Sequence, residues 1–170
     1  MLSAPVAWIA LLLFAGTMAF TGVKDALTMT ISNRLVVLLF AAYIVLAPAA
    51  GVGFDTAFLS ALAATTALAC TIGLFTMGWI GGGDAKLVPV AILWLGHGLA
   101  LEFVLYASVF GAALTLLILQ LRRVPVPAPL TSRQWLRRMH DEETGIPYGV
   151  ALAMAAVVLL PQSHWYNAVL

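Results

Sequence analysis

The chain has 170 residues, of which 63% are hydrophobic and 9% are charged, and its formal net charge is +1. Soluble domains average about 25% charged residues, so this composition excludes a water-soluble enzyme, a disordered tail and a secreted disulfide scaffold. The small net charge also argues against nucleic-acid binding, which needs a basic face to neutralise phosphates. We therefore predict an integral membrane protein of one compact domain, residues 1–170.

The charged residues divide the chain into apolar segments that are long enough to cross a membrane. A helix needs about 20 apolar residues to cross about 30 Å of hydrocarbon. The pattern predicts an all-α, polytopic protein with about six transmembrane helices, at residues 5–23, 35–51, 56–79, 86–101, 103–121 and 147–162. The fourth span is the weakest, because Gly96, His97 and Gly98 indicate a turn; a re-entrant segment there would leave five spans.

The basic residues favour six spans over five. With six, every Lys and Arg lies on one side of the membrane, and the opposite side keeps only Asp55 and Glu102. The positive-inside rule then places both termini outside, in the periplasm. The loops at 24–34, 80–86 and 122–146 are predicted to lie in the cytoplasm.

The 122–146 loop has two parts. Prolines at 125, 127 and 129 predict an extended segment. Residues 131–134, Thr-Ser-Arg-Gln, fit a capping box for a short helix, which would present Trp135, Leu136 and Met139 on one face. This pattern is typical of an interfacial helix on the membrane surface, and a solvated linker is the alternative.

Two carboxylates adjoin helix ends on the predicted cytoplasmic side. Asp25 follows the first span, and Asp84 comes directly after three glycines, which we expect to end the third helix in a tight non-helical turn. The structural alternative is that Asp84 caps the N-terminus of the fourth helix and the glycines cap the C-terminus of the third. Two carboxylates brought within a few Å share a proton, so one acts as an acid and the other as a base on water.

The sequence offers few residues for a metal site, a cysteine-based site or a nucleotide-binding site. His97 and His164 are predicted outside and His140 inside, so they do not form one metal site. A single cysteine, Cys70, excludes an intrachain disulfide and a CxxC site. There is no glycine-rich nucleotide loop either. We therefore predict no metal and no cofactor.

Three motifs together resemble the type IV prepilin peptidases, which are aspartic proteases of the bacterial inner membrane. Residues 81–86, Gly-Gly-Gly-Asp-Ala-Lys, are similar to the family's GxGD-x-K motif. Residues 25–33 are similar to its D-x-x-T-x-x-I-P-N pattern, with Ser32 in place of the proline. Residues 147–151, Pro-Tyr-Gly-Val-Ala, resemble the P-Y-G-x-A stretch that opens the family's last helix.

The resemblance implies the short form that serves tight-adherence (Flp-type) pili, without a methyltransferase domain. The substrate would be a prepilin or pseudopilin, cleaved after a glycine at the cytoplasmic face of the inner membrane. Lipid and the pilus-assembly machinery would be further partners. Asp25 and Asp84 would be catalytic, and the candidates for motif or substrate contacts are Thr28, Asn33, Gly81, Gly83, Lys86, Pro147, Tyr148 and Gly149.

Two other functions remain open at this point. A non-catalytic assembly factor of a pilus or secretion system would tolerate loss of either aspartate. A small proton-coupled transporter would use Asp25 and Asp84 as a proton relay. If the protease hypothesis holds, we expect the carboxyl oxygens of Asp25 and Asp84 to lie about 4–8 Å apart and to face a cavity.

Overall fold

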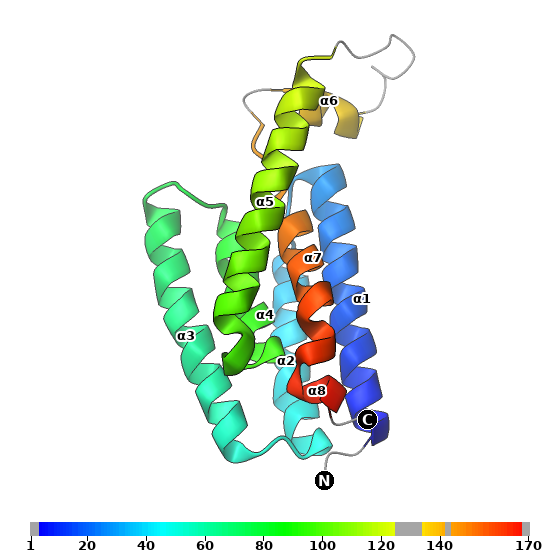
Figure 1. The fold of residues 1–170 in the computed structure, drawn as a ribbon, viewed down its shortest axis with the longest axis vertical. Coiled ribbons are helices and arrows are strands. Elements are labelled where there is room, and N and C mark those ends of the chain that lie inside the picture. The colour runs from blue at the N-terminus through cyan, green and yellow to red at the C-terminus, as the bar shows by residue number, and fades with distance from the viewer. Residues whose placement is uncertain (1–3, 125–133, 142–143, 168–170) are drawn as a thin grey trace.

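The computed structural model describes residues 4–124, 134–141 and 144–167, and all the regular elements in these ranges are helical (Figure 1). In chain order they are α1 (Ala4–Thr28), α2 (Asn33–Ala50), α3 (Phe54–Thr76), α4 (Gly82–Leu95), the 3₁₀ turn η1 (His97–Leu99), α5 (Ala100–Arg122), α6 (Gln134–His140), α7 (Tyr148–Leu159), the 3₁₀ turn η3 (Leu160–Gln162) and α8 (His164–Asn167). The predicted all-helical class is confirmed for this part of the chain.

Among the described residues, four helical segments are long and apolar enough to cross a membrane: α1, α2, α3 and the continuous run of η1 and α5. They correspond to the first, second, third and fifth predicted spans, and they make the chain a multi-pass membrane protein. The fourth and sixth predicted spans correspond to α4, with 14 residues, and α7, with 12. A 14-residue helix is about 21 Å long, which falls short of the hydrocarbon thickness.

The short helix α4 lies inside the bundle. All of its residues from Leu87 to Leu95 are buried except Val88, which is partly buried. A helix that is apolar all round is typical of such a central position. The helix ends at Gly96, whose φ of 98° few other residues adopt, so the predicted turn before α5 is confirmed.

An aromatic cluster anchors the far end of α4. The ring of Trp94 stacks on Phe14 with centroids 5.2 Å apart, and its Nε1 donates a hydrogen bond to the carbonyl oxygen of Leu39. Trp165, which lies in α8, donates a hydrogen bond from its Nε1 to the carbonyl oxygen of Trp94. The cluster therefore ties α1, α2, α4 and α8 together at one end of the bundle.

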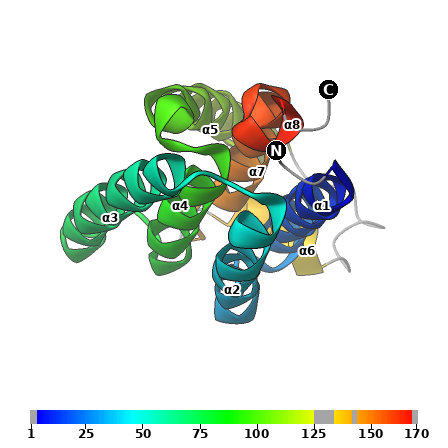
Figure 2. The ribbon, with the colours of Figure 1, turned by 90° about the horizontal axis from the view of Figure 1, so that it is seen from below.

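The other short helix, α7, packs between α1 and α5 (Figures 1 and 2). Its contact with α1 is close: a Cβ built on Gly22 would lie 2.9 Å from the Cβ of Ala153. Small residues allow this approach of two helix backbones in a membrane protein. Gly22 and the alanines of α7 therefore determine how near the two helices lie.

The break between α3 and α4 differs from the prediction. α3 ends at Thr76, and the non-helical segment runs from Met77 to Gly81, with Gly78 at a φ of 74°. Gly82 and Gly83 belong to the first turn of α4. The left-handed conformation of Gly78 turns the chain earlier than the glycine run suggests, because glycine adopts positive φ without a steric penalty.

All three predicted cytoplasmic loops begin at the same end of the bundle, as Figure 1 shows for the ends of α1, α3 and α5. Residue 4, the 51–53 turn and α8 lie at the opposite end. This arrangement agrees with the one-sided distribution of basic residues. Asp25 differs from its predicted place, because α1 continues to Thr28 and so includes it.

The short helix predicted in the 122–146 loop forms as α6, and it packs against α1 and α5. Its place at the membrane surface stays a prediction. Arg138 donates a hydrogen bond to the carbonyl oxygen of Thr28, the last residue of α1. Arg122 donates to the carbonyl oxygens of Met139 and Thr144. The proline segment and residues 131–133 of the capping box lie outside the described residues.

The orientation of the bundle is testable with single cysteines in a Cys70→Ala background. Arg123 and Asp55 are both exposed, at opposite ends of the structure. We expect Asp55→Cys to react with a membrane-impermeant maleimide in intact bacterial cells, and Arg123→Cys to react only after permeabilisation. The physical reason is the clustering of Lys and Arg at the Arg123 end. The reverse labelling pattern would show that both termini face the cytoplasm.

Candidate active site

Asp25 is a buried carboxylate in the last turns of α1. Its side chain is 5% exposed, and its Oδ2 accepts a hydrogen bond of 2.8 Å from the backbone N–H of Gly149, 124 positions further along the chain. Gly149 lies in the first turn of α7, where backbone N–H groups have no partner within the helix. Asp25 therefore caps α7 from a neighbouring helix, and the positive end of that helix stabilises its negative charge.

The contact requires a glycine at position 149. A Cβ built there would lie 2.8 Å from the Oδ2 of Asp25 and 3.0 Å from its Cγ. A side chain at position 149 would therefore force the Asp25 side chain or the start of α7 to shift. The predicted substrate-contact residue Gly149 is thus placed against Asp25 itself.

Asp84 lies in the first turn of α4, with Gly81 at the N-cap. Its Oδ1 is buried without a hydrogen-bond partner in the described part of the chain. Burial raises the pKa of Asp84 to about 6, and the nearby charge of Asp25 adds to this rise, while a hydrogen bond with the Gly81 backbone opposes it. A carboxyl group with such a pKa holds a proton more readily than an ordinary surface aspartate.

The structure brings the two predicted motifs together. Ile31, in the loop after α1, packs on Gly83, where a Cβ would lie 2.8 Å from the Cβ of Ile31. The Nζ of Lys86 donates a 3.1 Å hydrogen bond to the Oδ1 of Asn33. A small cavity of about 280 Å³ is lined by residues 29–31 and 81–84.

These contacts show what several of the predicted motif residues touch within the chain. Ile31, in the loop after α1, takes the space beside Gly83. Lys86 and Asn33 bond to each other, so they tie α4 to the start of α2. Thr28 donates to the carbonyl oxygen of Lys24 and closes the last turn of α1.

Tyr148 and Asp84 both line a larger cavity of about 1240 Å³. The ring of Tyr148 packs on Gly111 of α5, where a Cβ would lie 2.6 Å from its Cε1. Its hydroxyl group is 3.4 Å from the Oγ1 of Thr115. Sequence reasoning missed Gly111 and Thr115, because a small residue within an apolar span carries no distinctive pattern. Pro147 is the N-cap of α7.

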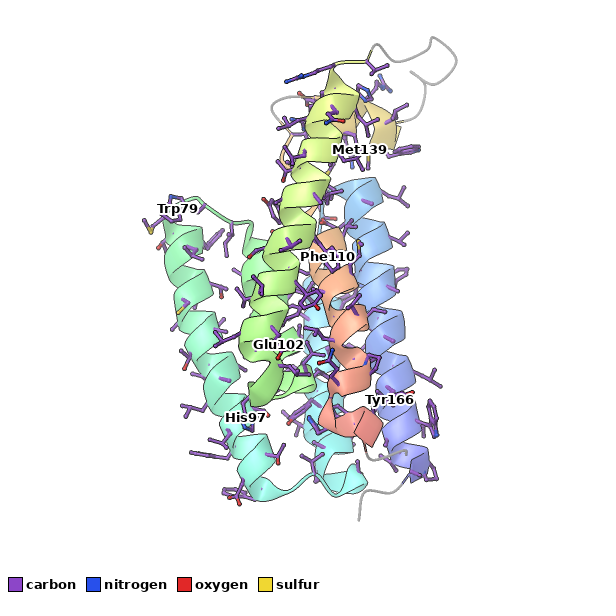
Figure 3. The ribbon with its side chains drawn as sticks, in the orientation of Figure 1. Trp79, His97, Glu102, Phe110, Met139 and Tyr166 are labelled. Atoms are coloured by element: carbon purple, nitrogen blue, oxygen red, sulfur yellow. The ribbon has the colours of Figure 1, made fainter. Side chains whose placement is uncertain are left out.

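The remaining ionisable residues that the sequence singled out lie elsewhere. Figure 3 shows His97 and Glu102 near the lower end of α5, below Trp79, which lies in the segment before α4. Asp55 is exposed at the start of α3. Within the described ranges, no group of three or more His, Cys, Asp or Glu side chains is arranged to hold a metal ion.

Fold and site together define a multi-pass helical membrane protein with two aspartates at one end of its bundle, one buried and one half-buried. The chain belongs to the type IV leader peptidase family, whose model matches residues 12–116. The matched range contains Asp25 and Asp84, and α7 lies outside it. No curated protein and no solved structure matches the chain. The family places the protein among the membrane peptidases.

The role of Gly149 can be tested with one added methyl group. We expect Gly149→Ala to lower peptidase kcat/KM about 100-fold, because displacing a catalytic group by about 1 Å has effects of that size. Gly16→Ala is the matched control, since it lies on the same helix as Asp25 and a Cβ there has nothing within 4 Å, and it should retain activity. Thermal unfolding in detergent should be measured for both variants. An active Gly149→Ala variant would show that the contact does not hold Asp25 in place for catalysis.

The raised pKa of Asp84 predicts a pH dependence. The carboxyl group holds its proton below about pH 6 and loses it above that pH. If Asp84 is the proton donor, kcat/KM falls as the pH rises through about 6, because the protonated fraction decreases. The measurement is a pH–rate profile on purified protein in detergent. A rate that increases through this range would assign the donor role elsewhere.

Proposed function

We propose that this protein is an aspartic endopeptidase that removes the leader peptide of type IV prepilins or pseudopilins of the Flp type. The observation that carries the proposal is the placement of Asp25 and Asp84 at one end of a membrane helix bundle, near enough for the charge of one to raise the pKa of the other. Family membership supports the leader-peptidase class. The aspartic mechanism and the substrate are our inference.

The two carboxylates suit different roles. We assign the role of base to Asp25, whose Oδ2 accepts a hydrogen bond from the backbone N–H of Gly149. In this assignment Asp25 takes a proton from the attacking water, while the protonated Asp84 donates one to the oxygen of the scissile carbonyl. The C–O bond forms to give a tetrahedral intermediate. The C–N bond then breaks as the proton on Asp25 passes to the leaving amine and Asp84 recovers its own.

The charge distribution supports cleavage at the cytoplasmic face of the bacterial inner membrane. The site lies at the end of the bundle where Arg122, Arg123 and Arg138 gather, and basic residues mark the cytoplasmic side. A leader peptide that has not crossed the membrane is present on that side. We also propose that the whole chain forms one peptidase domain, with α6 at the membrane surface in the loop 122–146.

Substitution of the two aspartates tests the mechanism. We expect Asp25→Asn and Asp84→Asn each to lower the rate of leader cleavage by about 100-fold or more, because each removes the acid or the base. The double variant should be no worse than either single one, since the two residues act as a unit. Cleavage is measured as conversion of a co-expressed prepilin to its mature form.

Asp55→Asn and Glu102→Gln are matched controls with carboxylates in the first turns of α3 and α5, and both should keep activity. Accumulation of mature pilin in either the Asp25→Asn or the Asp84→Asn variant would contradict the mechanism. It would favour a non-catalytic assembly factor, in which both aspartates are dispensable.

A further inference from the structure

A long apolar groove runs between α3 and α5, with α4 and α7 as its floor. Its volume is about 1240 Å³. Trp79 and His97 both line it, and Figure 3 shows them near opposite ends of α3, so the groove follows the length of the bundle. The α3 wall extends from Leu59 to Leu74, which corresponds to about 22 Å of helix.

The outer wall of the groove is a helix with little other support. α3 lies at the edge of the bundle and packs mainly against α4 (Figure 2). Its groove face includes small, uncharged side chains, among them Ala63, Thr66, Ala67 and Cys70. The facing wall of α5 includes Phe103, Val104 and Ala107. Side chains of this kind allow an apolar helix to approach closely.

One end of the groove is continuous with the candidate active site. Asp84 is the single carboxylate among the described residues that line it, and no Lys or Arg is among them. Gly81 and Tyr148 line the same end. A helix lying in the groove would therefore present the peptide bonds at its end to Asp84, and no basic side chain would disturb its apolar part.

We propose that the groove between α3 and α5 binds the apolar transmembrane helix of the substrate and places its cleavage site at Asp84. This inference rests on the proposed leader-peptidase function and adds where the substrate lies. About 15 residues of helix match the groove length. The groove, rather than the pair Asp25 and Asp84, then selects substrates that carry such a helix after the cleavage site.

The chain's single cysteine gives a direct probe of the occupant. Cys70 is exposed and lines the groove. A synthetic peptide with a Lys-rich leader, a glycine and about 20 apolar residues is placed in liposomes with the uncleaving Asp25→Asn variant, and one cysteine is moved along its apolar part. Oxidation with copper phenanthroline should form disulfides with Cys70 at every third or fourth peptide position, since one helix face meets α3.

The control for this experiment moves the protein's cysteine to the outer surface of α3. In the Asp25→Asn, Cys70→Ala background, Ala69→Cys provides an exposed thiol on a face that does not line the groove. It should give no periodic disulfides. Equal crosslinking from both positions, or none from Cys70, would show that lipid fills the groove and would overturn the proposal.

A matched pair of tryptophan variants tests the consequence for catalysis. Ala67 lines the groove and Ala69 does not, so Ala67→Trp fills the groove while Ala69→Trp adds the same bulk outside it. We expect Ala67→Trp to lower kcat/KM for the long peptide by about tenfold or more, and Ala69→Trp to change it by less than about twofold. A short peptide that ends a few residues after the glycine should be cleaved by Ala67→Trp at the wild-type rate.

The outcomes separate the two proposals. Equal cleavage of the long peptide by both tryptophan variants would overturn the groove proposal and leave the peptidase intact. If Ala67→Trp lost both peptides equally, the groove would have no role in selecting the helix, and this would also overturn the proposal. Failure of the wild-type protein to cleave either peptide would contradict the proposed function, while the Cys70 disulfides would still report on the groove.

Discussion

The hydrogen bond between the N–H of Gly149 and the carboxylate of Asp25 is the interaction on which the site depends. A carboxyl group buried in an apolar bundle is costly unless it is hydrogen-bonded, and the start of a helix offers a free backbone donor. The donor reaches Asp25 because α7 lies close to α1, with Gly22 against Ala153. Helix packing, helix capping and the position of a charged group therefore depend on one another here.

The packing around the first turn of α4 explains why Asp84 differs from a surface aspartate. α4 has 14 residues and is anchored at its far end by the hydrogen bond from Trp94 to the carbonyl oxygen of Leu39. Ile31 then covers Gly83 from the side. The resulting burial is the main cause of the raised pKa of Asp84.

Charge spacing and glycines are sufficient to predict a helical membrane protein, the turn at Gly96 and the placement of Asp25 and Asp84 toward the same end of the bundle. Helix length was harder to predict, because the apolar pattern of α4 is the same whether it faces lipid or protein. Two contacts join residues far apart in the chain: the hydrogen bond from Gly149 to Asp25 and the packing of Tyr148 on Gly111. Such contacts depend on how closely two helices pack, and this distance cannot be predicted from composition.

The two aspartates differ in what surrounds them, and this difference determines which of them a substrate in the groove reaches first. Asp25 is enclosed between α1 and α7 and is not among the described residues that line the groove. Asp84 lines that groove, and its Oδ1 has no hydrogen-bond partner in the described part of the chain. A substrate in the groove would therefore meet Asp84 first. It would leave Asp25 in its place, because the groups that hold Asp25 belong to α1 and α7, away from the α3 wall.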